Sequence, residues 1–272
     1  QQRSSAASDV YKRQLYGFER LAKMERSIVE RGVSPAELSE EELRLWKSHG
    51  FSDAHIADAL AGFPPAGLKS LAAGQDERAV MQRRHHVGLH PVYRMVDSCA
   101  AEFAAKTPYY YSTYEPHGSS GIDRLPDMDK RTKERLVAIG SGPIRIGQGI
   151  EFDYGCVHAV KAIREAGKDA ILINNNPETV STDFDTSDRL YFDPLTLEYV
   201  SEILLREQAH GILLQFGGQT AINLALPLEA RLPDLAASGL DLSIMGTSCD
   251  AIDEASAVSY THLTLPTIAV VG

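Results

Sequence analysis

The chain has 272 residues, of which 43% are hydrophobic and 24% charged, and its formal net charge is −10. This length allows one large or two ordinary domains, and the composition is that of a soluble globular protein. The excess of acid argues against a general nucleic-acid binder, because phosphate contacts need clustered lysine and arginine. We find no apolar stretch of the roughly 20 residues that a membrane span needs and no secretory signal, so we predict a cytoplasmic protein.

The cysteines indicate neither a disulfide framework nor a metal knuckle. Cys99, Cys156 and Cys249 lie far apart and are odd in number. This distribution is typical of isolated core thiols in reducing surroundings.

Both ends of the chain differ in character from the sequence between them. Residues 1–14 are polar and aperiodic, and residues 258–272 interrupt a helical pattern. Both resemble translated adapter or vector sequence, so we predict two non-native tails. The alternative is a disordered native head and a genuine terminal strand, because residues 261–271 also have strand periodicity.

Residues 15–114 have a helical pattern, with apolar residues close to a 3.6-residue period. The first of these apolar positions are Leu15, Phe18, Leu21, Ile28 and Val29. Ser34 with Glu37, and Ser39 with Glu42, have the spacing of capping boxes. We therefore predict an all-helical amino-terminal domain. The tyrosine cluster "PYYYSTYE" at 108–115 is either a packed aromatic seam or an interface patch.

Residues 115–134 contain glycine, proline, serine and charge without an apolar period, which predicts a linker. Short apolar runs then alternate with helical segments over residues 135–257. The runs are "RLVAIG", "DAILINNN", "RLYF", "GILLQF" and "LSIMGT", with helices expected after the first, third, fourth and fifth. This alternation predicts an α/β fold, a Rossmann-like parallel sheet covered by helices on both faces.

The glycine-rich loop "GSGPIRIGQG" after the first run does not have either familiar nucleotide spacing. Arg145 occupies the position of the third dinucleotide-fingerprint glycine, and Gln148 replaces the phosphate-loop lysine. These mismatches disfavour a nucleotide-binding oxidoreductase. The nearby acids Asp183, Asp185 and Asp188 lack the spacing of a calcium loop, so we expect turn and helix caps and no metal site.

Two further loop features suggest anion binding. Arg145 has the charge and reach to hold a carboxylate or phosphate, although a surface ion pair is an equal alternative. Gly217 and Gly218 allow a tight bend after a strand, and Gln219 and Thr220 would start the next helix with free N–H groups above the sheet.

Three loop segments together resemble the large subunit of carbamoyl phosphate synthetase, in its carboxyl-terminal, carbamoyl-phosphate-synthesising half. These segments are "GSGPIRIGQGIEFDYGCVHA", "NPETVSTDFDTSDRLYFDP" and "QFGGQT". The stretches "HGFSDAHIA" and "LHPVYRMVDSCAAEFAAKTPYYYSTYE" are similar to the end of the helical oligomerisation domain that precedes this half. The resemblance runs from about Leu15 to Ala257.

The resemblance implies that residues 135–257 are the domain that precedes an ATP-grasp fold. The intact ligase uses one ATP to activate bicarbonate, combines it with ammonia from a glutaminase small subunit, and uses a second ATP to phosphorylate carbamate. ATP and Mg²⁺ or Mn²⁺ would bind mainly outside this chain, so we expect no cofactor here and an inactive isolated chain. Whether the product enters arginine or pyrimidine synthesis stays open.

The resemblance also implies that Glu151, Glu178 and Gly149 line a passage for carbamate between two active sites. Acidic walls would favour neutral carbamic acid over its anion. From the residues alone, the favoured interpretation is a helix-start acid for Glu151 and an exposed loop acid for Glu178. The alternative for the whole chain is a non-catalytic oligomerisation or scaffold module that self-associates through the helical domain.

Overall fold

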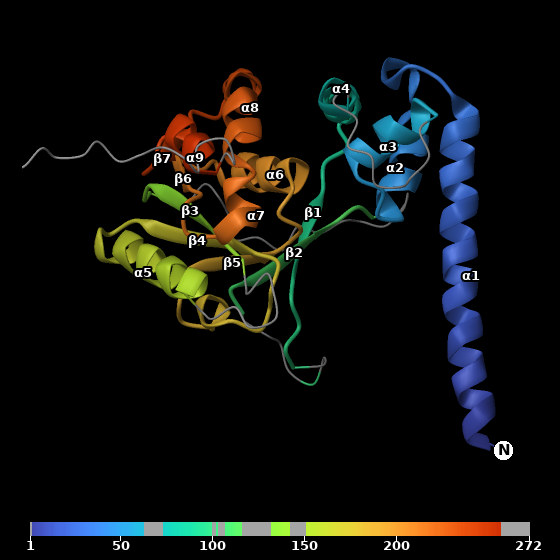
Figure 1. Cartoon of the computed structure of the whole chain (residues 1–272), viewed down its shortest axis with the longest axis horizontal. Helices are drawn as coiled ribbons and strands as arrows, with labels where there is room; N and C mark the ends of the chain where they lie inside the picture. Colours follow the sequence, from blue (N-terminus) through green and yellow to red (C-terminus); the bar gives the residue numbers. More distant parts are fainter. Residues whose placement is uncertain are drawn as a thin grey trace, which may run out of the picture. The chain divides into compact units, whose positions relative to one another are not determined.

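The computed structural model describes residues 2–62, 73–99, 102, 107–115, 132–141 and 151–256. Its contacts divide the chain into two compact units, Gln1–Val92 with Thr113–Asp123 and Tyr93–Ser112 with Arg124–Gly272. We name them the helical unit and the sheet unit; Figure 1 shows the elements of each. Most of the predicted linker and all of the predicted second tail lie outside the described residues. The domain boundaries inferred from the sequence therefore stay predictions.

The helical unit begins with a long helix. Its elements are α1 (Gln2–Arg31), the 3₁₀ helix η1 (Pro35–Glu37), α2 (Glu40–Ser48), α3 (Asp53–Leu60) and α4 (Ala73–His86). The predicted boundary after residue 14 thus lies inside α1. No helix in the described part of the chain is both long and apolar enough to cross a membrane.

One of the two predicted capping boxes is confirmed. Ser39 Oγ accepts the Glu42 N–H at 3.2 Å, and the Glu42 carboxylate accepts the Ser39 N–H at 2.9 Å. The box at Ser34 is wrong, because Ser34 makes no side-chain cap. There the chain tightens into η1, and the Glu37 N–H binds the Ser34 carbonyl at 2.9 Å instead.

A buried ionic cluster joins three helices of the helical unit. Asp53 of α3 lies 3.1 Å from Lys47 Nζ of α2 and 3.0 Å from an Arg84 guanidinium nitrogen of α4, and all three side chains are at most 1% exposed. Lys47 and Arg84 also lie over the Tyr114 ring, at 5.0 and 5.6 Å from its centre. The carboxylate thus compensates two buried cations, which makes it costly to remove.

The sheet unit contains a seven-stranded sheet in the order β1-β2-β5-β4-β3-β6-β7. Its strands are β1 (Val92–Met95), β2 (Tyr109–Thr113), β3 (Arg135–Gly140), β4 (Asp169–Asn174), β5 (Arg189–Phe192), β6 (Gly211–Leu213) and β7 (Ser243–Met245). Every neighbouring pair from β2 to β7 is parallel. The predicted α/β fold is confirmed, and the five predicted strands are β3 to β7.

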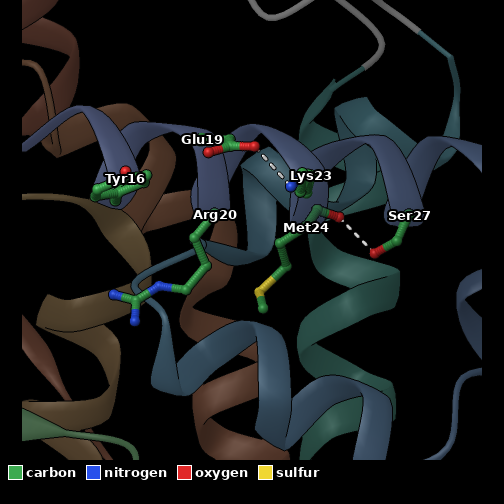
Figure 2. Close-up of a pocket in the computed structure, with 6 residues that line it drawn as sticks. All are labelled: Tyr16, Glu19, Arg20, Lys23, Met24 and Ser27. Carbon is green, nitrogen blue, oxygen red and sulfur yellow. Dashed lines mark hydrogen bonds and ion pairs between the residues drawn. The ribbon is translucent and has the colours of Figure 1, made fainter. Parts of the chain in front are cut away.

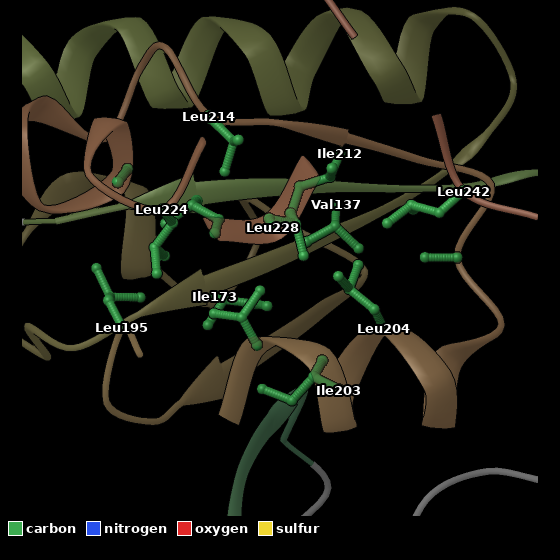
Figure 3. Close-up of a cluster of buried hydrophobic side chains, with 14 of the residues drawn as sticks. Val137, Ile173, Leu195, Ile203, Leu204, Ile212, Leu214, Leu224, Leu228 and Leu242 are labelled. Atoms are coloured by element: carbon green, nitrogen blue, oxygen red, sulfur yellow. The ribbon is translucent and has the colours of Figure 1, made fainter. Parts of the chain in front are cut away.

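Helices cover both faces of this sheet, as predicted. Side chains of successive strand residues point to opposite faces, so each continuous apolar run places apolar side chains on both. The helices are α5 (Glu151–Glu165), α6 (Leu197–Glu207), α7 (Gly218–Ile222), α8 (Ala225–Ala237) and α9 (Cys249–Ser256). Val137 and Ile139 of β3 pack with residues of α6, α8 and α9, whereas Leu136 and Ala138 pack with α5. Figure 3 shows Val137 and Ile173 among Ile203, Leu204 and Leu228 of the first face.

The helical pattern predicted for residues 15–114 is wrong at its end, where the structure has the strands β1 and β2. The tyrosines of the cluster at 108–115 are largely packed: Tyr110 lies 5.8 Å from the Tyr191 ring and Tyr109 lies 5.6 Å from the Phe192 ring. Tyr110 is buried, whereas Tyr111 is 42% exposed. The packed-seam interpretation therefore fits Tyr109 and Tyr110, because aromatic residues of β2 pair with those of β5.

Candidate functional site

The carboxyl ends of β3, β4 and β6 lie at one edge of the sheet, because these strands are parallel and Gly140 pairs with Asn174. The strands β4 and β5 follow β3 on one side, and β6 lies on its other side. In open α/β sheets, ligands bind outside the carboxyl ends of the strands where the order reverses in this way. The candidate site is therefore the group of loops that follow β3, β4 and β6, of which the structure describes residues 141, 175–188 and 214–217.

A buried hydrogen bond connects the first and third of these loops. Ser141 Oγ donates to the Gly217 carbonyl at 2.5 Å. A Cβ at Gly217 would lie 2.5 Å from the Ile139 carbonyl oxygen and from Ala221 Cβ, so a side chain has no room there. Gly218 has φ +63°, in the left-handed region that favours glycine. The two glycines thus allow the loop after β6 to approach β3 closely.

The predicted anion-binding residues lie partly outside the described residues. Arg145 and Gly149 belong to the undescribed stretch 142–150, so their predicted roles stay predictions. Gln219 is exposed and donates from Nε2 to Asn223 Oδ1 at 2.8 Å, and Thr220 is half-buried within α7. An anion at the start of α7 also stays a prediction.

The loop after β4 holds Glu178 by a succession of turns. Asn174 Oδ1 accepts the Asn176 N–H at 2.8 Å, and Asn176 Oδ1 accepts the Glu178 N–H at 2.9 Å. Both are Asx turns, which fix the backbone through a side-chain oxygen. Glu178 is exposed and lies just before the 3₁₀ helix η3 (Val180–Thr182).

A residue that sequence reasoning missed, Asp153, lies in the first turn of α5. Its Oδ2 accepts the Ser181 N–H at 2.8 Å, and its Oδ1 has no hydrogen-bond partner among the described residues. Asp153 is only 2% exposed. Glu151 is the first residue of the same helix. An acid in a first helical turn ordinarily interacts with the helix dipole, so the sequence carried no sign of this longer-range bond.

The cysteine prediction is confirmed for Cys156 and Cys249, which are free and buried. Burial and the negative charge of Asp153 raise the pKa of Cys156 to about 12. This thiol is therefore protonated at neutral pH and unsuited to nucleophilic or metal chemistry.

The bonds of the acids at 183–188 differ from the expected turn and helix caps, because Asp188 bonds to a residue 18 positions earlier and the turn at Asp183 is closed by its backbone carbonyl. Asp188 Oδ2 accepts the Ala170 N–H at 2.8 Å, and the Thr186 N–H binds the Asp183 carbonyl at 3.1 Å. Arg164 Nε lies 3.6 Å from Asp188 Oδ1. The carboxylate of Asp188 is thus used within the fold.

A surface hollow of about 410 Å³ lies elsewhere, on α1 of the helical unit. Figure 2 shows that its lining residues come from successive turns of this one helix, with the Glu19–Lys23 ion pair (2.7 Å) among them. A single helix cannot enclose a ligand, so we place no site there.

Comparison with known proteins found a family model that matches part of the sheet unit. Residues 132–254 match the family model described as the carbamoyl phosphate synthase preATP-grasp domain. This stretch is similar to that domain family. The match spans β3 to β7 and therefore all three loops of the candidate site.

Curated relatives extend the similarity into the helical unit, and three of them are named carbamoyl phosphate synthase large chain. That of Myxococcus xanthus is 50% identical over 220 residues, which are 80% of this chain and 18% of the relative. Those of Methanosarcina barkeri and Methanothrix thermoacetophila are 45% and 49% identical over 86% and 79% of this chain. The chain spans about a fifth of the length of the curated relatives it matches.

Proposed function

We propose that this chain is a segment of a carbamoyl phosphate synthase large chain and acts as part of that ligase. The observation that supports this most strongly is the 50% identity to a large chain over 80% of these residues. In this proposal the whole enzyme uses bicarbonate, ammonia released by a glutaminase small subunit, and two ATP. The segment itself serves the transfer of carbamate between two phosphorylation steps.

We propose that no nucleotide binds at these loops. Arg145 is the basic residue of the three loops, whereas the loop after β4 contains the acids Glu178, Asp183, Asp185 and Asp188. Nucleotide phosphates need cationic side chains and a glycine loop of fixed spacing, whereas these loops contain one basic residue and neither familiar spacing. We therefore assign ATP and Mg²⁺ or Mn²⁺ to other parts of the full-length subunit and no step of their chemistry to these loops.

The acids of the site fit a different task. Glu151 begins α5, and Glu178 is exposed at the same edge of the sheet. Carboxylates along a passage repel an anion, so they favour carbamate in its neutral carbamic acid form. We propose that Glu151 and Glu178, with Gly149, line such a passage.

Reconstitution of the full-length subunit with its glutaminase tests the proposed function. Bicarbonate, glutamine, ATP and Mg²⁺ should yield carbamoyl phosphate, and omission of bicarbonate should abolish it. Carbamoyl phosphate should also form when ammonia replaces glutamine, because ammonia is the direct nitrogen donor. Absence of carbamoyl phosphate from a folded, ATP-binding complex would contradict the proposal.

Self-association is a second role, which exposed apolar residues on α1 favour. Leu15, Tyr16 and Phe18 are 65 to 69% exposed. Apolar side chains gathered on one helix commonly pack against another protein surface. Light scattering on the purified chain should give a mass above that of a monomer, and Phe18→Ser should lower it. A monomer at all concentrations would contradict this role.

A further inference from the structure

Buried side chains connect the start of α5 to the end of β4. Asp153 accepts the Ser181 N–H at 2.8 Å, and Ser181 Oγ accepts Nδ2 of Asn174 at 3.2 Å. Asp153 is 2% exposed, and Asn174 and Ser181 are fully buried. Buried hydrogen bonds of this kind are costly to leave unmade, so they hold the first turn of α5, η3 and the end of β4 in one arrangement.

These buried hydrogen bonds continue through Asn174 into the exposed loop that contains Glu178. The other side-chain atom of Asn174, Oδ1, accepts the Asn176 N–H, and Asn176 Oδ1 accepts the Glu178 N–H. Asn174 thus uses its amide as a donor on the buried side and as an acceptor on the loop side. The backbone of Glu178 is linked in this way, step by step, to Asp153, which lies two residues after Glu151.

We propose that Asn176, anchored through Asn174 and Ser181 to Asp153, is a positioning residue that fixes Glu178 relative to the start of α5. This inference rests on the proposed role of Glu178 in carbamate passage. A loop released from the anchor would place the carboxylate in several positions, and carbamate would escape before the second phosphorylation. The first phosphorylation takes place elsewhere and would continue at its normal rate.

Asn176 allows a clean test because it is half-buried, so its truncation leaves no core cavity. Asn176→Ala removes the acceptor of the Glu178 N–H, and Asn176→Asp keeps an acceptor oxygen. Asn175→Ala is the matched control, since Asn175 is the exposed neighbour and its side chain makes no hydrogen bond to any described residue.

The measurement is ADP formed per carbamoyl phosphate by the full-length synthetase, with bicarbonate and ammonia as substrates. In the proposed reaction two ADP form for each carbamoyl phosphate. We expect Asn176→Ala to raise the ADP formed beyond this ratio roughly 2- to 10-fold, which is the range that loss of one hydrogen bond produces in a local equilibrium. Asn175→Ala and Asn176→Asp should stay close to the wild type. Bicarbonate-dependent ATP cleavage should be unchanged in all of them.

A double variant distinguishes positioning from a general structural effect. If Asn176 acts through Glu178, adding Asn176→Ala to Glu178→Ala should cause no further rise in excess ADP, because neighbouring residues with one shared role are not additive. An additive rise would overturn the inference.

The outcomes also separate this inference from the proposed function. If Glu178→Ala raises the ADP formed per carbamoyl phosphate and Asn176→Ala does not, the positioning role of Asn176 is overturned. The proposed passage for carbamate then still stands. An unchanged ratio in Glu178→Ala would overturn both. Circular dichroism on each variant shows whether the subunit is folded.

Discussion

Asp153 Oδ2 accepts the backbone N–H of Ser181, 28 residues later in the chain, at 2.8 Å. Both residues are buried at the carboxyl edge of the sheet. One carboxylate therefore ties the start of α5 to the loop that presents Glu178. Buried hydrogen bonds therefore fix the exposed residues of the site, and their removal should lower the stability of the sheet unit.

Replacing Asp153 with alanine should destabilise the sheet unit by about 1 to 3 kcal/mol, because the Ser181 N–H loses its buried acceptor. Asp153→Asn should cost less, since an amide oxygen can still accept this bond. Urea unfolding of the purified chain measures both values. Asp241→Ala, at an exposed acid of the same unit, serves as the control. Equal losses for Asp153→Ala and Asp241→Ala would show that the bond does not contribute to stability.

The ionic cluster of the helical unit should be more sensitive. Asp53→Ala leaves Lys47 and Arg84 without their buried carboxylate, for which we expect a loss of about 3 to 5 kcal/mol. Asp58→Ala, in the same helix and partly exposed, should change the free energy of unfolding by less than about 1 kcal/mol. Urea unfolding followed by Trp46 fluorescence reports on this unit. A small effect at Asp53 would mean that water reaches the two cations.

Asp193 should make the stability of the sheet unit depend on pH. Burial raises its pKa from 3.8 to about 6, although hydrogen bonds from the Ser112 N–H and hydroxyl lower it. The folded state thus holds the proton more tightly than the unfolded state, and the stabilisation present below pH 3.8 is lost as pH rises through 6. Asp193→Asn removes this loss. The variant's stability relative to wild type should therefore increase by about 2 to 3 kcal/mol between pH 4 and pH 7.

Urea unfolding of the wild type and Asp193→Asn at several pH values between 4 and 7 measures this difference directly. Titrations of all other groups are shared by the two proteins and cancel. A difference independent of pH would indicate that Asp193 has an ordinary pKa in the folded state.

The close approach at Gly217 predicts a steric effect. Gly217→Ala would place a methyl group 2.5 Å from the Ile139 carbonyl oxygen, which should cost about 1 to 3 kcal/mol or displace the loop after β6. Gly17→Ala is the matched control, because a Cβ there meets nothing within 4 Å in helix α1. That change should be neutral or stabilising by up to about 1 kcal/mol. Thermal unfolding of both variants decides whether the bend requires glycine.

The sequence alone predicted the strands β3 to β7, because each is a short apolar run followed by polar or glycine residues. It missed β1 and β2. Tyr93, Tyr110 and Thr113 favour strands, but the surrounding helical period concealed this preference. The strand β2 joins the rest of the sheet through β5, which lies some 80 positions later in the chain and pairs Tyr191 with Tyr110.

The candidate site was predicted as a group of loops and not as a network. Parallel strands place their carboxyl ends together, so the loops after β3, β4 and β6 could be grouped from the pattern. The bonds from Ser141 to Gly217 and from Asp153 to Ser181 join residues of different loops and helices. Such pairings depend on the register of the folded sheet, which no local pattern specifies.

The most direct test of the account compares Glu178→Ala with Asp183→Ala, two exposed acids of one loop, in the full-length synthetase. The measured quantity is ADP formed per carbamoyl phosphate. We expect Glu178→Ala to raise this ratio while bicarbonate-dependent ATP cleavage persists, and Asp183→Ala to leave it unchanged. An unchanged ratio in Glu178→Ala, or the same rise in both variants, would contradict the account.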